Sequence, residues 1–338
     1  MPSNNDQYTL TRRAALTTMG IGVTASAILL NQSCSQAQSV PNSNTTEALQ
    51  GAGFYRFNIG NMQCAVISDG QNVMPPKTFA QNASEAAINQ VLEENYLSTK
   101  EIPTQINTML VQTAGINILV DTGLGGGVGP NNGLTVKHLK RLGLEPKDIG
   151  IIVITHMHGD HIGGLFNDAG DKIYPNAELV ISKQALDYWP NAGSSNDTQR
   201  MQRLVSGANE VLARYKGNVR TVIGDDEIVQ GIKVVPLFGH TPGHIGLNIA
   251  NGSDQLFYIA DTVHMVYMQM PHPDWHVAFD MNPIEAEQTR KRVFELAAQE
   301  RLLVAGSHIP FPALGHIRKQ SVGSGFMWQP IIWVWNPA

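Results

Sequence analysis

Short runs of apolar and β-branched residues recur along the chain from residue 54 onward, and most are bounded by Gly, Asn, Pro or Asp. Runs of this length and composition predict β-strands. We expect strands at residues 55–59, 63–68, 106–112, 116–120, 151–155, 179–182, 232–237, 245–250, 255–260 and 302–305.

Two helical patterns accompany these runs. Residues 84–97 carry apolar side chains at the spacing of one helix face, at Ala87, Ile88, Val91, Leu92 and Tyr96. Asn282, Pro283 and Glu285 combine a capping side chain, a proline for the first turn and a glutamate three residues after the cap, which predicts a helix to about residue 299. Strands with helices between and after them predict an α/β protein.

The first 37 residues have the layout of an export signal. Arg12 and Arg13 precede an uncharged apolar run at residues 14–30, and a polar stretch ends in Ser35-Gln36-Ala37. This order is typical of the twin-arginine signal, with cleavage after Ala37. We therefore expect the twin-arginine export machinery as a partner and a periplasmic or secreted location. A membrane anchor, through an uncleaved signal or lipidation at Cys34, is the alternative.

Residues 38–53 are rich in Ser, Asn, Thr and Gln and predict a flexible linker. No stretch as polar recurs later in the chain, and we see no internal repeat. Residues 54–338 are therefore expected to form one large domain.

The amino-acid composition excludes several classes of function. The 338 residues are 42% apolar and 15% charged, which is enough for a sizeable packed core. The 23 Lys and Arg against 28 Asp and Glu give a formal charge of −5, so nucleic acid is not an expected partner. Cys34 and Cys64 are the only cysteines, which excludes a disulfide framework and a cysteine-rich zinc module. Eleven histidines remain as candidates for chemistry.

A dense set of metal-capable side chains follows the apolar run at residues 151–155. His156, His158, Asp160 and His161 lie within six residues. In a turn after a strand, the first two histidines can face one ion while Asp160 and His161 reach a second, and imidazole and carboxylate suit Zn²⁺ and its neighbours. The spacing therefore predicts a site for two metal ions.

Three other strand ends carry residues that can complete such a site. His240 follows the strand predicted at 232–237, Asp261 follows the one at 255–260, and His308 follows the one at 302–305. Each of these signals is weak alone.

Taken in chain order, these segments resemble the metallo-β-lactamase fold superfamily: His-x-His-x-Asp-His at 156–161, Gly-His-Thr-Pro-Gly-His at 239–244, Ala260-Asp261-Thr262 and Ser307-His308. More narrowly, Ser68-Asp69-Gly70, Val120-Asp121-Thr122-Gly123 and residues 308–318 resemble the methyl parathion hydrolase subfamily with its lactonase and arylesterase relatives. The resemblance implies a four-layer αβ/βα sandwich hydrolase domain at residues 54–338, with a binuclear metal site at the edge of its two sheets.

The resemblance also implies a ligand set and a reaction. One metal is expected on His156, His158 and His240 and the other on Asp160, His161 and His308, with Asp261 bridging them and Asp121 fixing the ligand loop. Zn²⁺ is the expected ion, and Mn, Fe, Co or Ni would also fit these ligands. A hydroxide shared by the metals would attack a small apolar ester or lactone, or a phosphotriester, and Asp160 and Asp261 are the expected catalytic carboxylates.

Two further residues are assigned to the substrate. His264 stands where the resemblance places a Tyr in acyl-homoserine lactonases, and we hypothesise that it binds the substrate and donates a hydrogen bond to the developing oxyanion or the leaving group. A pocket-wall imidazole with no catalytic part is the alternative. Trp189 matches an aromatic residue of the substrate pocket in the parathion-hydrolysing relatives, and a core or surface tryptophan is its alternative.

Two other functions fit parts of the sequence. A β-lactamase would share Asp160 and His161, although Asp261 stands where one subclass has a cysteine. A non-catalytic metal-binding protein could keep the fold and lose turnover, although all seven expected ligands are present. Related hydrolases are often dimers, so a homodimer is an alternative to a monomer.

Overall fold

The structure is a computed structural model that describes residues 53–126, 129, 131–193, 198–321 and 323–334. The predicted signal sequence at residues 1–37 and, apart from Gly53, the predicted linker at 38–53 lie outside the described residues. Within the described ranges, no helix is both long and apolar enough to cross a membrane.

The first sheet has seven strands among the described residues, in the order β1-β2-β3-β4-β5-β6-β7. Neighbouring strands are antiparallel from β1 to β4 and parallel from β4 to β7. The strands are β1 (Phe54–Ile59), β2 (Met62–Met74), β3 (Ile102–Thr113), β4 (Ile116–Val120), β5 (Ile151–Val153), β6 (Glu178–Ser182) and β7 (Val219–Val222).

The second sheet also has seven strands in the described part of the chain, in the order β14-β13-β12-β11-β10-β9-β8. Its neighbours are antiparallel except for β11 and β12, which run parallel. The strands are β8 (Glu227–Val229), β9 (Ile232–Pro236), β10 (Ile245–Asn251), β11 (Asp254–Tyr258), β12 (Leu303–Ala305), β13 (Leu314–Lys319) and β14 (Phe326–Pro330).

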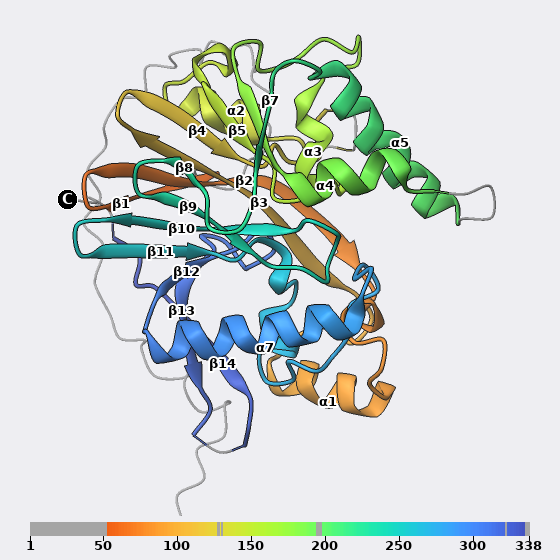
Figure 1. The fold of residues 1–338 in the computed structure, drawn as a ribbon. Coiled ribbons are helices and arrows are strands. Elements are labelled where there is room, and N and C mark those ends of the chain that lie inside the picture. The colour runs from red at the N-terminus through yellow and green to blue at the C-terminus, as the bar shows by residue number, and fades with distance from the viewer. Residues whose placement is uncertain (1–52, 127–128, 130, 194–197, 322, 335–338) are drawn as a thin grey trace, which may run out of the picture. The chain divides into compact units, whose positions relative to one another are not determined.

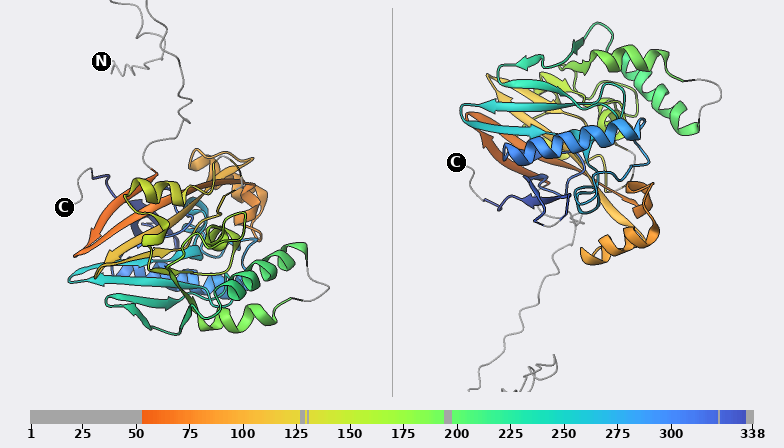
Figure 2. Two further views of the ribbon diagram at one scale, coloured as in Figure 1. Left: turned by 90° about the horizontal axis from the view of Figure 1, so that it is seen from above. Right: turned by 60° about the horizontal axis from the view of Figure 1, so that its bottom comes forward.

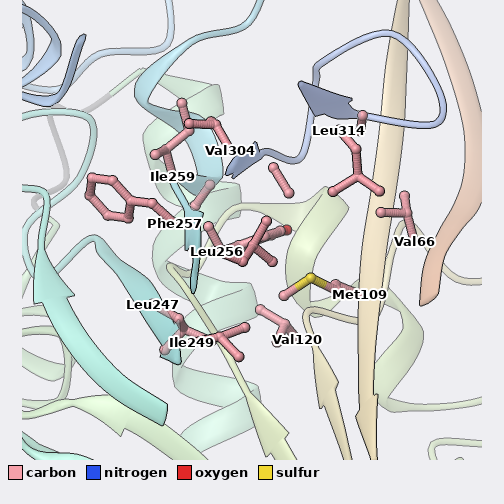
Figure 3. Packing of buried hydrophobic residues seen from close by; sticks show 14 of the residues in the cluster. Val66, Met109, Val120, Leu247, Ile249, Leu256, Phe257, Ile259, Val304 and Leu314 are labelled. Atoms are coloured by element: carbon pink, nitrogen blue, oxygen red, sulfur yellow. The ribbon is translucent and has the colours of Figure 1, made fainter. Parts of the chain in front are cut away.

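The main core lies between the two sheets, and strand alternation explains it. On β3, Met109 and Val111 point into this core while Leu110 between them packs on the other face of the sheet. Leu247 and Leu256 of the second sheet belong to the same core, and Figure 3 shows them together with Met109. Each such side chain stabilises the fold by about 1.5–3 kcal/mol when fully buried.

Helices cover the outer face of each sheet. The helices α2 (Thr135–Arg141), α4 (Lys183–Tyr188) and α5 (Gln199–Arg214) pack on the first sheet in a second apolar cluster. The left view of Figure 2 looks down on this helical layer. Helix α7 (Pro283–Gln299) packs Val293, Phe294 and Ala297 onto the second sheet and lies on the opposite side of the molecule's folded part in Figure 1. The predicted four-layer sandwich is therefore confirmed.

The remaining elements are short. Helix α1 (Glu85–Glu94) packs with α6 (Val266–Gln269) in a third apolar cluster, and α3 (Gly159–Ile162) follows β5. Single 3₁₀ turns lie at Pro76–Phe79, Pro146–Asp148, Gly163–Leu165, Trp189–Asn191 and Ala260–Thr262.

The strand directions place the candidate ligands at one edge of the sandwich. His156 follows β5, whereas His240, Asp261 and His308 follow β9, β11 and β12. The last three strands point the same way, because β9 and β11 are each antiparallel to β10, and β11 is parallel to β12. Their carboxyl ends therefore open at the same edge of the second sheet.

Candidate metal centre

The structure brings all seven expected ligands together in two adjoining groups. The ligand atoms of each group lie within 4.8 Å of one another. The first group is His156, His158, His240 and Asp261, and the second is Asp160, His161 and His308.

In the first group three imidazole nitrogens converge. Nδ1 of His158 lies 3.0 Å from Nε2 of His156 and 3.0 Å from Nε2 of His240. Burial and the neighbouring imidazoles lower the pKa values of His156 and His158 well below the ordinary value. These rings are therefore neutral at pH 7, which is the protonation state in which an imidazole nitrogen can bind a cation.

Asp261 lies between the two groups. Its Oδ2 is 3.4 Å from Nε2 of His240 and 2.9 Å from Nε2 of His308, and its Oδ1 is 3.3 Å from Nε2 of His161. A carboxylate in this position can serve both groups, as the bridging assignment of the sequence requires.

The carboxylates around the second group favour positive charge at its histidines. Burial alone would lower the pKa of His161, but Asp261, Asp121 and Asp160 raise it well above the ordinary value. The pKa of His308 is raised to about 8, because Asp261 and Asp160 outweigh its burial. In the described part of the chain, Nε2 of His161 and Oδ1 of Asp261 are buried without a hydrogen-bond partner. Buried nitrogen and oxygen atoms that lack a hydrogen-bond partner and lie among negatively charged carboxylates are suitable ligand atoms for divalent cations.

Other residues orient the ligands through their second nitrogens. Asp121, at the end of β4, accepts hydrogen bonds from the backbone N–H and the hydroxyl of Thr155 and lies 2.8 Å from Nδ1 of His161. Nδ1 of His308 donates to the carbonyl of Gln105 at 2.7 Å. Such partners fix the ring orientation and the tautomer of a metal-binding histidine.

Two orienting residues were missed from the sequence. Asp280 lies 2.8 Å from Nδ1 of His240, and Arg290 on α7 forms an ion pair with Asp280 at 3.2 Å. Both side chains are buried. One feature of the sequence could have pointed to Arg290. It lies on the face of the predicted helix that also carries the apolar Ala286, Val293 and Phe294, so a buried arginine with an acidic partner could have been expected there.

A cavity of about 240 Å³ opens onto the centre. Asp160, Asp261 and His308 line it together with His158 and His264, and its remaining walls are mainly apolar. The other lining residues are Asn72, Met74, Thr104, Ile106, Leu124, Gly159, Arg200, Leu204 and Phe279.

Trp189 does not belong to this cavity lining. Its side chain is fully buried in the apolar cluster beneath α4 and α5, with Leu179 and Ala185. The structure therefore corrects the substrate-pocket assignment in favour of the alternative, a core tryptophan, because the turn after α4 directs the ring into the helical layer.

His264 lies at the boundary between the centre and the cavity. Its Nε2 is 3.3 Å from Oδ2 of Asp261, and its ring stacks on that of His308 with centroids 4.9 Å apart. The side-chain oxygen of Gln269 accepts a hydrogen bond from the backbone N–H of His264, which fixes the backbone at His264. Burial lowers the pKa of His264 to about 4, so the imidazole is neutral at pH 7 and carries one N–H that can be donated.

Comparison with known proteins agrees with this geometry. The family model of the metallo-beta-lactamase superfamily matches residues 102–308. An N-acyl homoserine lactonase of Bacillus thuringiensis is 26% identical over 218 residues, which cover 59% of this chain and 79% of that protein.

Two solved structures are similar over most of the chain. AidC, described as a dizinc quorum-quenching lactonase in complex with a product, has a TM-score of 0.79 at 28% identity and covers 83% of this chain and 98% of its own. The hydrolase AbOPH, described as a member of the beta lactamase superfamily, has a TM-score of 0.78 at 30% identity and covers 84% of this chain and 99% of its own.

Proposed function

The chain belongs to the metallo-β-lactamase superfamily, and from this premise we propose that it is a binuclear metal-dependent hydrolase that opens small apolar lactones or esters. The observation that carries the proposal is the pair of ligand groups on either side of Asp261, at the end of a mainly apolar cavity. The lactonase and hydrolase relatives support the same class of reaction.

The grouping of the ligand atoms indicates which residues would hold each metal ion. His156, His158 and His240 would hold one ion, Asp160, His161 and His308 the other, and Asp261 both. Divalent ions at such a site supply Lewis acidity and lower the pKa of water toward neutrality. Zn²⁺ is the ion we propose, since imidazole and carboxylate suit it and AidC is described as dizinc.

The chain's own residues complete the chemistry. Asp160 is 24% exposed at its side chain and lines the cavity, so it can take a proton from the attacking water and pass it to solvent. Neutral His264 can donate its N–H to the developing oxyanion or the leaving group. The apolar walls formed by residues such as Met74, Leu204 and Phe279 exclude water around the substrate.

The test combines metal content with substrate choice. Protein purified without chelator should contain two metal ions per chain by mass spectrometry and should hydrolyse an N-acyl homoserine lactone or an aryl ester faster than paraoxon or nitrocefin. A chelator should abolish this turnover and added Zn²⁺ should restore it. Turnover of nitrocefin alone would identify a β-lactamase, bound metal without turnover a non-catalytic metal-binding protein, and absence of metal would refute the proposal.

Replacing His264 by leucine is expected to lower kcat for the preferred lactone by about ten- to a hundredfold with a smaller change in KM, because a donor to the transition state is lost. Steady-state rates on metal-loaded protein measure both constants. The exposed His316 provides the matched change, His316→Leu, which should leave them unaltered. Unchanged lactone turnover in His264→Leu would show that the imidazole has no catalytic part.

We also propose that the protein acts outside the cytoplasm after twin-arginine export. Arg12 and Arg13 before the apolar run support this proposal. Changing both arginines to lysine is expected to retain the full-length chain in the cytoplasm, whereas the unaltered protein should be recovered from the periplasm without its first 37 residues. Periplasmic recovery of the double-lysine variant would contradict this route of export.

A further inference from the structure

The cavity beside the metal centre has a cation in its wall for which the proposed reaction has no use. Arg200 lies in the first turn of α5 and belongs to the cavity lining, as does Leu204 one turn later on the same helix face. Among the described residues that line the cavity, Arg200 is the only lysine or arginine. The reaction itself is assigned to carboxylates and imidazoles, so this guanidinium needs another explanation.

Two contacts hold the guanidinium of Arg200 against the cavity wall. Its Nη1 donates a hydrogen bond to the carbonyl of Ala278 at 3.1 Å, and its Cζ lies 5.2 Å from the centroid of the Phe279 ring. Phe279 lines the same cavity, and its ring centroid is 5.9 Å from that of His264. The cation is therefore fastened to a part of the wall that reaches the metal centre.

The charge of Arg200 acts inside the cavity as well as at the surface. The residue as a whole is exposed, but desolvation by the surrounding protein lowers its pKa, against the charges of Asp160 and Asp280. Besides burial and the neighbouring imidazoles, the charge of Arg200 lowers the pKa of His158. Asp160 and His158 both line the cavity, so the guanidinium lies within electrostatic reach of the end at which the metals would bind.

The hydrogen-bonding capacity of this guanidinium exceeds what the protein uses. In the described part of the chain, Arg200 forms no ion pair with a carboxylate, and the carbonyl of Ala278 accepts one of its N–H groups. Arg290 shows the opposite arrangement, since it is buried and paired with Asp280 at 3.2 Å. A guanidinium has a planar set of N–H donors that matches a carboxylate, so the remaining donors of Arg200 suit an anionic group of a ligand.

We propose that Arg200 makes the cavity selective for esters or lactones whose apolar chain ends in a carboxylate. The apolar walls contact the chain, the guanidinium of Arg200 donates to the carboxylate, and the scissile carbonyl lies at the end of the cavity that carries Asp261 and His264. Hydrogen bonds between a guanidinium and a carboxylate are charge-assisted and therefore stronger than neutral ones. This inference rests on the proposed hydrolysis and adds an anionic end to the apolar substrate.

The test compares two esters that differ only at the end of the acyl chain. The hexanoate ester of para-nitrophenol ends in a methyl group, and the adipate monoester carries a carboxylate at the same position. Unaltered, metal-loaded protein should favour the adipate ester. Arg200→Met keeps the length of the side chain and should lower the ratio of kcat/KM for adipate over hexanoate by about tenfold, mainly through KM. Arg200→Lys keeps the charge and should lower this ratio less.

Arg203→Met is the matched control. Arg203 lies on the same helix and is exposed, but it does not belong to the cavity lining. The change removes the same charge from the same helix and should leave the ratio for the two esters unaltered. A ratio that is unchanged in Arg200→Met, or that falls equally in Arg200→Met and Arg203→Met, would overturn the proposal while leaving the proposed hydrolysis intact.

A binding measurement separates this selectivity from the proposed function. In calorimetry, unaltered metal-loaded protein should bind adipate about tenfold more tightly than hexanoate, and Arg200→Met should reduce this difference to the roughly twofold that two equivalent carboxylates give by statistics. If the unaltered protein cleaves neither ester but shows this loss of binding, hydrolysis fails and the carboxylate selectivity stands. If unaltered protein and Arg200→Met show the same difference between adipate and hexanoate, the selectivity is refuted.

Discussion

Replacing Asp261 by asparagine is expected to lower kcat/KM for the preferred lactone or ester by about a thousandfold or more. Asp261 Oδ2 lies within 3.7 Å of nitrogen atoms of His156, His240, His264 and His308, so a single carboxylate serves both ligand groups. Burial alone would raise its pKa, but His161, His308 and His156 lower it well below the ordinary value. Asparagine keeps the size and removes this charge.

Metal content and rate should fall together in Asp261→Asn. Mass spectrometry should find fewer than two ions per chain, because neither group retains its shared anionic ligand. The exposed Asp225 supplies the matched change, Asp225→Asn, which should keep both metals and full activity. A variant at Asp261 that retained two metals and near-normal kcat would show that this carboxylate does not bridge the centre.

Replacing Arg290 by methionine is expected to lower the free energy of unfolding by about 3–5 kcal/mol, because it leaves Asp280 as a buried charge without its ion-pair partner. The guanidinium is 1% exposed and donates to the carbonyls of Thr262, Pro273 and Trp275 at 2.9–3.0 Å as well as to Asp280. It therefore ties α7 to the segment after Asp261. Urea unfolding of metal-loaded protein measures the loss.

Arg292, two residues further along α7, is exposed, so Arg292→Met is the control and should change the free energy of unfolding by less than about 0.5 kcal/mol. Equal stability of the two variants would show that the ion pair with Asp280 contributes nothing.

The pH dependence of this loss follows from Asp280. Burial would raise its pKa, but the hydrogen bond from His240 and the charges of His240 and Arg290 lower it to about 2. A carboxylate with a lowered pKa contributes stability above its unfolded value, and this contribution disappears as the pH falls toward the folded value. The difference between Arg290→Met and the unaltered protein should therefore be largest at neutral pH and should shrink as the pH falls, because protonation of Asp280 removes the unpaired buried charge in the variant. A difference independent of pH would implicate another group.

The gathering of the candidate ligands at one site could be predicted, because metal-binding residues leave a dense local signal in the sequence. Four ligands lie within six residues after one apolar strand, and the other three follow strands whose direction is set by the sheet. All ten expected strands are present, as are the helices at 85–94 and 283–299. β7, β8, β13 and β14 were missed because they are short or interrupted by polar residues, so their membership depends on neighbours distant in sequence.

Apart from Asp121, the residues around the ligands could not be predicted, because their contacts join segments that are distant in sequence. Asp280 reaches His240 across 40 positions, and Gln105 reaches His308 across 203. Nothing local distinguishes either residue from an ordinary polar side chain. For Trp189, the resemblance to the parathion-hydrolysing relatives suggested a place in the substrate pocket. The packing of α4 and α5 instead places its side chain in the apolar core, and this packing could not be seen in the sequence.

The division of the ligands between the sheets has a thermodynamic consequence. Four of them follow β5 of the first sheet and three follow strands of the second, so bound cations would cross-link two halves that otherwise meet through apolar side chains and a few hydrogen bonds. Cations that bind the folded chain alone stabilise it by RT ln(1 + [L]/Kd), about 2.7 kcal/mol at a hundredfold excess over Kd. Metal supply would thus govern how long the sandwich survives proteases, and a starved cell would lose the protein itself as well as its activity.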